Sequence, residues 1–294
     1  MTNGNDIDDS QENLDLYETG TYHGIVRQLQ AFSLFDKLIQ IFNQSSASST
    51  NGIVSKYFLE HFYELDRLNI YDVARECFTS RSGIRRFAQS VGFDNFSSMK
   101  EDVWEWRLRE KYFTDYVDHE DFRSYWTSQL VEMLDSINER LDDATLDQLA
   151  ASLRASEQPI LLASDYSSMS LREFQQSMLV LNKLIRVATD SFGDLSVLNA
   201  LTPHDVIIIV SASGNFAQSV EKTFPAETKG KKIIVTLNPK FEASDAFDDC
   251  ICLTHAEYHR TKTVYSEYGF RYFFDLLYHR YFERYGKGTA QADN

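Results

Sequence analysis

Cysteine is scarce in this chain of 294 residues, which holds only Cys77, Cys250 and Cys252. Three cysteines provide no disulfide framework, and no secretory signal pattern stands at the start of the sequence. Long apolar runs are missing too, since the longest purely aliphatic run, Val206 to Val210, is far too short to span a bilayer. We therefore expect a cytoplasmic protein with reduced thiols and no membrane partner.

Basic residues are also in deficit, with 29 lysines and arginines against 44 aspartates and glutamates and a formal net charge of −15. This balance argues against a protein that coats nucleic acid through general basicity. The deficit is not uniform, because residues 75–100 carry five basic side chains and only two acidic ones. An acidic protein with a locally basic face is compatible with sequence-specific DNA binding, with weak non-specific affinity and a steep salt dependence.

Length and apolar pattern together predict two domains. The polar, acidic residues 1–20 and the tail 287–294 are expected to be disordered. Apolar residues at helical spacing predict an all-α domain over 21–112, followed by an acidic linker over 113–123 and a second domain over 124–286. Within the first domain, the predicted helices cover 25–42, 53–66, 70–77, 80–91 and about 95–113, and a serine-rich loop covers 43–52.

Residues 69–100 are the most informative stretch, because their pattern is typical of a helix-turn-helix. Val73 and Ala74 give a short first helix an apolar face, and the turn follows at Phe78. Ser80 is placed as the N-cap of the second helix, where its hydroxyl can accept a backbone N–H. Helical spacing predicts that Ile84, Phe87, Ala88 and Val91 are buried, and that Gly92 follows the helix as a left-handed C′ residue.

The opposite face of the second helix is polar and basic. Arg81 and Arg85 lie one helical turn apart, and arginine can pair bidentately with guanine in the major groove. A solvated helix face in an ordinary helical protein is the alternative interpretation. Trp104 and Trp106 are expected to pack rather than to touch DNA. The predicted contacts to a double-stranded operator come from Ser80, Arg81, Ser82, Arg85, Arg86, Gln89 and Lys100.

The second domain carries short apolar runs without alternation, separated by helical segments. This pattern predicts a parallel sheet with helices on both faces, a three-layer α/β sandwich. The predicted strands cover 160–163, 185–188, 206–210, 232–237 and 250–253, and the predicted helices cover 125–137, 145–156 capped by Thr145, 169–184 and 263–285. The last helix has more apolar surface than one face can bury, so we expect a subunit interface and at least a homodimer.

Matching positions run through the helix-turn-helix and the helix before it: Ile53, Val54, Tyr57, Phe58, Leu59, Asp72, Val73, Ala74, Ser80, Ile84, Arg86, Phe87, Val91, Gly92, Phe93, Phe96, Met99 and Lys100. This set resembles the N-terminal domain of RpiR-type bacterial transcriptional regulators. The resemblance implies a C-terminal sugar isomerase-like (SIS) domain with a five-stranded sheet that senses a phosphosugar, and control of carbohydrate-metabolism genes.

Two positions of the helix-turn-helix depart from the family pattern. Phe78 stands where the family usually has a turn glycine, which indicates a modified turn. Gly83 stands where the family usually has a small hydroxyl residue or alanine. A glycine costs about 1 kcal/mol against alanine in a helix interior, so the recognition helix is expected to be locally weakened.

In doubly wound sheets, ligands bind beyond the carboxyl ends of the strands. The loop 211–216, Ser-Ala-Ser-Gly-Asn-Phe, resembles the SIS pattern Ser-x-Ser-Gly-x-Thr, whose hydroxyl and N–H groups form an anion nest. The loop 163–168 resembles the SIS pattern Gly-x-Gly-x-x-Ser, with both glycines lost. Asp165 and Phe216 disfavour a phosphate, each by about 1–3 kcal/mol. The resemblance implies effector contacts from Ser167, Ser168, Ser211, Ser213, Gly214 and Asn215; a different polar ligand, a domain kept only for dimerisation, and ordinary turn chemistry are the alternatives.

Four zinc-competent side chains, Cys250, Cys252, His255 and His259, stand within ten residues. Their spacing fits no common zinc module, and cysteine in a buried strand behaves as a small hydrophobe. We therefore expect no metal and no cofactor.

The enzyme alternative is a sugar-phosphate isomerase with a helical appendage, which would need a general base at the sugar. Glu173, Glu221 and Glu267 are helix-surface candidates that nothing in the sequence distinguishes. No catalytic set emerges, and we expect a regulator rather than an enzyme.

Overall fold

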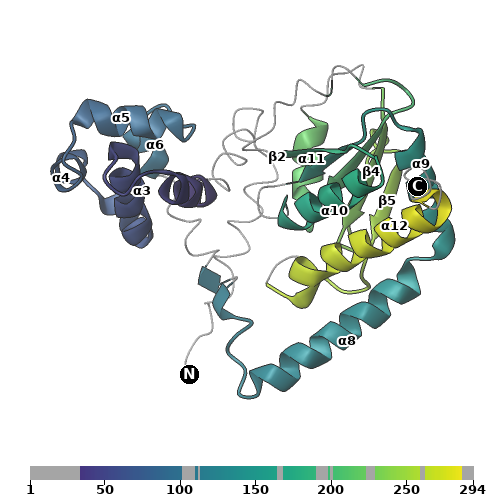
Figure 1. Ribbon diagram of the computed structural model, residues 1–294. Helices are drawn as coiled ribbons and strands as arrows, with labels where there is room; N and C mark the ends of the chain where they lie inside the picture. Colours follow the sequence, from purple (N-terminus) through teal and green to yellow (C-terminus); the bar gives the residue numbers. More distant parts are fainter. Residues whose placement is uncertain are drawn as a thin grey trace, which may run out of the picture. The chain divides into compact units, whose positions relative to one another are not determined.

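The computed structural model describes residues 34–100, 110–111, 113–163, 168–189, 198, 201–222, 229–258 and 262–286, without the side chains of 168 and 169. The chain divides into two compact units, Met1–Arg107 and Leu108–Asn294, and each is described by itself (Figure 1). The predicted tails, Trp104 and Trp106 lie outside the described residues. The predicted domain limits remain a prediction.

The N-terminal unit is helical throughout its described elements, in agreement with the sequence. A helix over 34–44 is followed by α3 (Thr50–Glu60), the 3₁₀ helix η1 (Phe62–Arg67), α4 (Ile70–Glu76), α5 (Arg81–Ser90) and α6 (Phe96–Lys100). The single helix predicted over 53–66 is wrong. Helix α3 begins earlier because Ser49 caps it, accepting the Gly52 N–H at 3.1 Å, and it ends before His61, whose backbone leaves the helical region.

Aromatic side chains from three helices form the core of this unit. The ring of Phe58 in α3 lies 5.7 Å from that of Phe87 in α5 and 5.9 Å from that of Phe96 in α6, measured between centroids. Aromatic pairs at this spacing stabilise a core beyond the area that they bury. The burial predicted for the second helix is confirmed at all four positions, Ile84, Phe87, Ala88 and Val91.

The C-terminal unit is built on a five-stranded sheet in the order β2-β1-β3-β4-β5, and every described pair of strands is parallel. The strands are β1 (Ile160–Ala163), β2 (Arg186–Thr189), β3 (Val206–Val210), β4 (Lys231–Thr236) and β5 (Asp249–Cys252). All five strands predicted from the sequence are thereby confirmed, with limits shifted by at most one residue. β-Branched and leucine side chains without alternation suit strands buried on both faces.

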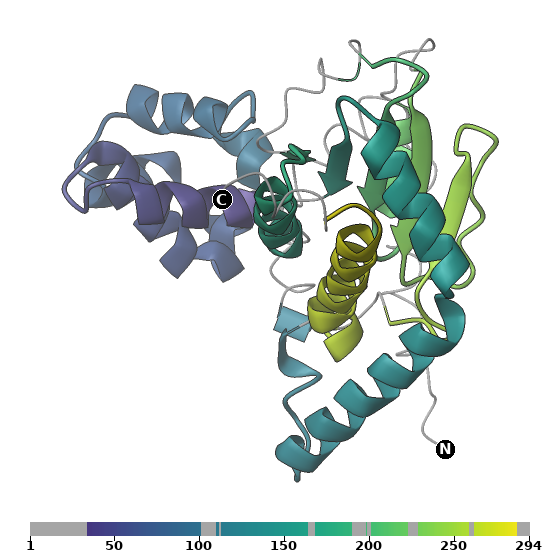
Figure 2. The ribbon, with the colours of Figure 1, turned by 45° about the vertical axis from the view of Figure 1, so that its right-hand side comes forward.

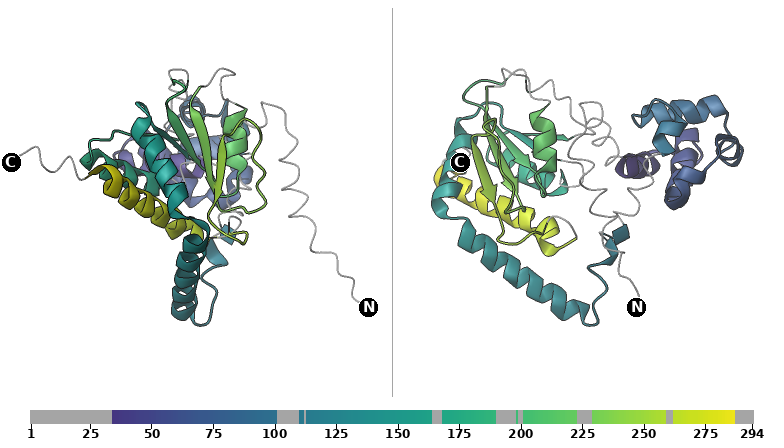
Figure 3. Two further views of the ribbon diagram at one scale, coloured as in Figure 1. Left: turned by 90° about the vertical axis from the view of Figure 1, so that its right-hand side faces the viewer. Right: turned by 180° about the vertical axis from the view of Figure 1, so that it is seen from behind.

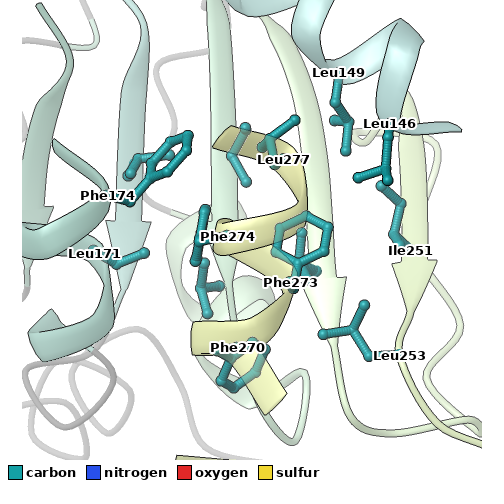
Figure 4. Packing of buried hydrophobic residues seen from close by; sticks show 14 of the residues in the cluster. Leu146, Leu149, Leu171, Phe174, Ile251, Leu253, Phe270, Phe273, Phe274 and Leu277 are labelled. Carbon is teal, nitrogen blue, oxygen red and sulfur yellow. The ribbon is translucent and has the colours of Figure 1, made fainter. Parts of the chain in front are cut away.

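Helices cover both faces of this sheet, so the predicted three-layer α/β fold is confirmed (Figures 1 and 3). Alternate strand residues such as Leu161 and Ile208 pack with α9 (Asp143–Ala155), α10 (Ser168–Val180) and α12 (Phe270–Tyr285) in one apolar cluster. Their neighbours Leu162 and Ile209 belong to a second cluster with α11 (Asn215–Glu221). Figure 4 shows the first cluster, in which α12 contributes Phe270, Phe273, Phe274 and Leu277.

Helix α8 (Phe122–Arg140) lies near the start of the second unit, and its fully buried residues fall in its second half (Figure 2). Met133 and Ile137 are its buried residues, and both lie against Gly269. The predicted linker, 113–123, precedes this helix and includes its first two residues. Its Phe113 and Tyr116 rings lie 5.0 and 5.1 Å from the Lys262 ammonium, a cation–π arrangement that holds part of the segment to the C-terminal unit.

The cap predicted for α9 is wrong. Asp142, not Thr145, caps this helix: its carboxylate accepts the Thr145 N–H at 2.8 Å. Both residue types favour the N-cap position, and the cap lies three residues earlier than the sequence predicted.

The final helix is interrupted near its start, where a π-helical turn, η5 (Tyr265–Gly269), precedes α12. Phe273 and Leu277 are fully buried within the unit, whereas Tyr268 and Phe282 are 47% and 41% exposed. The helix therefore buries more of its apolar surface internally than the sequence suggested. The subunit interface at this helix remains a prediction.

Candidate DNA-binding surface and ligand loop

The turn between α4 and α5 is a Schellman motif with an aromatic residue in the left-handed position. The Thr79 N–H donates to the Ala74 carbonyl at 2.9 Å, and the Phe78 N–H donates to the Arg75 carbonyl at 3.1 Å. Phe78 has φ of 51°, a conformation that glycine adopts without strain, and its side chain is 90% exposed. The modified turn predicted from the sequence thus keeps the geometry of a glycine turn around a phenylalanine.

Helix α5 begins and ends with the local signals that its sequence predicted. The Ser80 hydroxyl accepts the Gly83 N–H at 3.1 Å and lies 2.8 Å from the Ser82 hydroxyl. Gly92 has φ of 98° after the helix, which confirms its left-handed C′ role. A Cβ atom on Gly83 would overlap the Thr79 hydroxyl. Gly83, which departs from the family pattern, therefore leaves the space that the Thr79 side chain occupies.

The polar face of α5 is exposed, with Arg81 held in place by the other helix of the motif. Its guanidinium donates to the Tyr71 hydroxyl at 2.9 Å and lies 4.7 Å from the centre of the Tyr71 ring. The fixed fork of arginine loses less freedom on binding when it is oriented in advance. Sequence reasoning missed Tyr71, because a contact between two helices leaves no spacing signal. The exposed residues of this face are Arg81, Ser82, Arg85, Arg86 and Gln89.

The remaining predicted contacts lie at the end of α5 and beyond it. The Gln89 amide donates to the Asp94 carbonyl at a long 3.4 Å, which places this side chain beside the loop that follows α5. Lys100, at the end of α6, lies with its ammonium 5.7 Å from the Phe96 ring and is partly buried. Arg81, Ser82, Arg85 and Arg86 therefore form the more coherent part of the predicted set.

Replacing Phe78 by glycine is expected to stabilise the N-terminal unit. A left-handed conformation costs a residue with a Cβ atom about 1 kcal/mol or more, and glycine avoids this cost. We expect a gain of about 1 kcal/mol in the free energy of unfolding, measured by urea denaturation. Phe78→Ala is the matched control, because it removes the ring and keeps the strain. A glycine variant no more stable than the alanine variant would contradict the strained turn.

The second candidate site is the loop between β3 and α11, at the carboxyl end of the sheet. The strand order reverses between β1 and β3, and doubly wound folds bind ligands at such a switch point. Gly214 has φ of 93° and precedes α11. Ser211 accepts the Ala217 N–H at 3.3 Å and Ser213 accepts the Asn215 N–H at 3.2 Å. Both serine hydroxyls therefore accept backbone N–H groups in the first turn of α11.

The loop after β4 packs directly onto this candidate site. The Phe241 ring lies so close to Gly214 that a Cβ atom there would overlap it. The Asn238 amide donates to the Ser213 carbonyl at 2.9 Å. Phe216 is half-buried and packs against the same apolar cluster as Phe241. Neither Asn238 nor Phe241 was singled out from the sequence, since their contacts with the serine loop join segments more than twenty residues apart.

Only part of the first ligand loop, 163–168, lies within the described residues. Ser167 and Asp165 lie outside the described residues, and Ser168 is placed only as the first backbone position of α10. The contacts predicted for these residues remain predictions.

The zinc-competent constellation has other partners among the residues described. Burial raises the pKa of the Cys250 thiol to about 11, with a further contribution from Cys252 and Asp249, so the thiolate needed for a metal is disfavoured. Cys252 donates to the Thr254 carbonyl, and Arg140 lies 2.9 Å from Nδ1 of His255. No group of three metal-competent side chains occurs in the described part of the chain, and His259 lies outside it.

The candidate general bases are engaged in structural contacts. Glu173 forms a two-pronged ion pair with Arg271, which joins α10 to α12. Glu221 accepts a hydrogen bond from the Ser244 hydroxyl at 2.6 Å, and Glu267 lies 3.5 Å from the Lys262 ammonium. Each of these three carboxylates therefore has a structural partner within the protein. Among the helices that the structure describes, none is long and apolar enough to cross a membrane.

Comparisons with known proteins find similarity in structure alone, since no protein-family profile and no curated protein sequence match the chain. The NanR protein of Vibrio vulnificus complexed with ManNAc-6P is 17% identical, covering 86% of this chain and 93% of its own with a TM-score of 0.46. The sugar isomerase domain of an RpiR transcription factor from Sphaerobacter thermophilus is 13% identical, covering 57% and 93% with a TM-score of 0.48. The family that the sequence resembles is thus among these neighbours.

Proposed function

We propose that this protein is a sequence-specific DNA-binding transcriptional regulator of the RpiR type, acting as a homodimer or higher oligomer. The observation that carries the proposal is the α4–turn–α5 motif, with a buried apolar face and an exposed basic face. Ser80 and Gly92 fix the limits of α5, and Tyr71 orients Arg81. A helix presented in this way suits the major groove, where dimeric proteins read two half-sites with matching symmetry.

The direct test uses the purified chain of 294 residues to select the duplexes that it binds from a pool of random DNA sequences. Enrichment of a motif with two related half-sites, bound more tightly than unselected duplex, is the expected result. The affinity for unselected duplex should fall steeply with salt, because it depends on the neutralisation of phosphates. A pool that shows no enrichment over several rounds would count against sequence-specific binding.

We further propose that the loop Ser211–Asn215 takes a carbohydrate derivative, of which a phosphosugar is the first candidate. Its place at the switch point of the sheet supports a ligand site, as does the left-handed Gly214. Binding there would act on DNA only if the ligand favoured one arrangement of the dimer over another. The contacts of Phe241 and of the serine hydroxyls favour the alternative, an α/β unit retained for dimerisation.

A thermal-shift screen against hexose, pentose and amino-sugar phosphates separates the two interpretations. A ligand at a hundredfold excess over its dissociation constant stabilises by about 2.7 kcal/mol. A shift seen with wild type and lost in Ser213→Ala would establish the effector site. If no compound shifts the midpoint, the regulator is constitutive or differently triggered.

A further inference from the structure

Phe78 combines two features that the fold itself does not require. Its backbone is held in the left-handed region at φ of 51°, where a phenylalanine is strained. Its ring is 90% exposed, so it contributes almost nothing to the core of the N-terminal unit. A strained conformation at a surface turn is a reason to look for a function at that turn.

The residues around Phe78 show which kind of partner its ring would meet. Arg75 precedes it in the last turn of α4, and Arg81 follows it in the first turn of α5. Both side chains are exposed, as are Arg85 and Arg86 further along α5. Arg75 is ion-paired with Asp72 at 3.0 Å and with Glu76 at 3.2 Å, so the excess positive charge beside Phe78 lies on the α5 side. An exposed aromatic ring bordered by cations suits a polyanion that also offers apolar groups. Duplex DNA is such a partner, because the methyl group of thymine projects into the major groove beside the phosphates.

We propose that Phe78 is a DNA-contacting residue whose ring packs against a thymine methyl group of the operator. The inference rests on the proposed DNA-binding function and deepens it by assigning a base-reading role to the turn. Arg81 and Arg85 then read or clamp the neighbouring positions, while the ring contributes apolar contact that no arginine supplies. The strain at φ of 51° is retained because the contact needs a side chain at a position that the fold would fill best with glycine.

The test uses the full-length protein and the duplex recovered by selection. Each thymine of the bound sequence is replaced in turn by deoxyuridine, which lacks only the methyl group, and affinities are measured by fluorescence anisotropy. One replacement is expected to weaken wild-type binding about fourfold, the value of one buried methyl group. Phe78→Gly and Phe78→Asn, two residues that accept the left-handed backbone, should bind the natural duplex more weakly and be indifferent to that replacement.

Tyr63→Ala supplies the matched control, because Tyr63 is another exposed aromatic residue of the same unit, at 59% exposure. It should keep wild-type affinity and the wild-type response to deoxyuridine. Phe78 variants that bind like wild type, or that remain sensitive to the same methyl group, would overturn the inference while DNA binding itself stands. If the variants instead lose dimerisation in sedimentation, Phe78 belongs to a subunit contact and the inference is wrong. A wild-type chain that selects no duplex would overturn both proposals.

Discussion

A variant with alanine at both Arg85 and Arg86 is expected to lose at least about thirtyfold in affinity for its selected operator. Both side chains lie on the exposed face of α5, and neither is needed for the core that Ile84 and Phe87 form. An arginine that reads a guanine contributes about 1–3 kcal/mol to the binding free energy. The contributions of two arginines add, so their effects on the binding constant multiply. The measurement is a titration of labelled operator at several salt concentrations, since any lost phosphate contact also lowers the salt slope by about one.

A double variant with the same change of charge is the control for this result. Lys56→Ala with Arg67→Ala removes two exposed cations from α3 and η1 of the same unit. It should bind nearly as tightly as wild type if the α5 face reads the sequence. Equal losses in the two double variants would show that overall charge, not this face, governs binding, and would contradict the assignment.

Removal of the Asp205 carboxylate is expected to cost the C-terminal unit about 3 kcal/mol of stability. The side chain is 1% exposed and accepts four hydrogen bonds, two from Thr202, one from the Ser156 hydroxyl and one from the Gln158 N–H, at 2.7–3.0 Å. These contacts tie the segment before β1 to the turn before β3. In Asp205→Ala the buried donors lose their acceptor, so the midpoint of urea denaturation should fall to a lower urea concentration.

The same carboxylate predicts a pH dependence with a definite sign. Burial alone would raise its pKa, but the hydrogen bonds from Thr202, Gln158 and Ser156 outweigh burial and lower the pKa to about 2. A lowered pKa gives stability that is complete above the unfolded value near 4 and is lost as the pH falls towards 2. Wild type should therefore lose about 2 kcal/mol over this window that Asp205→Asn does not lose. A constant difference between the two proteins from pH 6 to pH 2 would contradict the assigned pKa.

The sequence predicted those elements whose signals are local. The short, β-branched run Val206–Val210 favours a buried strand, and the structure places one there. Ser80 and Gly92 mark the two ends of α5 by capping chemistry, which acts within a few residues. The cap of α9 shows the limit of such signals, because Asp142 and Thr145 are both competent and the apolar spacing favoured the wrong one.

The candidate sites were predicted less completely, because their decisive contacts are distant in sequence. The phenol of Tyr71 reaches Arg81 across the angle between two helices. Phe241 reaches Gly214 from the loop of another strand, and no spacing pattern announces that contact. Departures from the family pattern were the better guide. Phe78 adopts the left-handed conformation of the glycine that it replaces, and Gly83 in α5 leaves room for the Thr79 hydroxyl.

The parallel sheet also has a consequence for the order in which the chain folds. Each of its strand pairs needs a crossover, so β1 must find β3 more than forty residues further along the chain. The N-terminal unit is built from short, consecutive helices whose contacts are mostly local. Chains with local contacts fold faster by orders of magnitude, and domains fold as they leave the ribosome. The helix-turn-helix is therefore expected to be folded, with its arginines exposed, while the parallel sheet of the second unit is still forming.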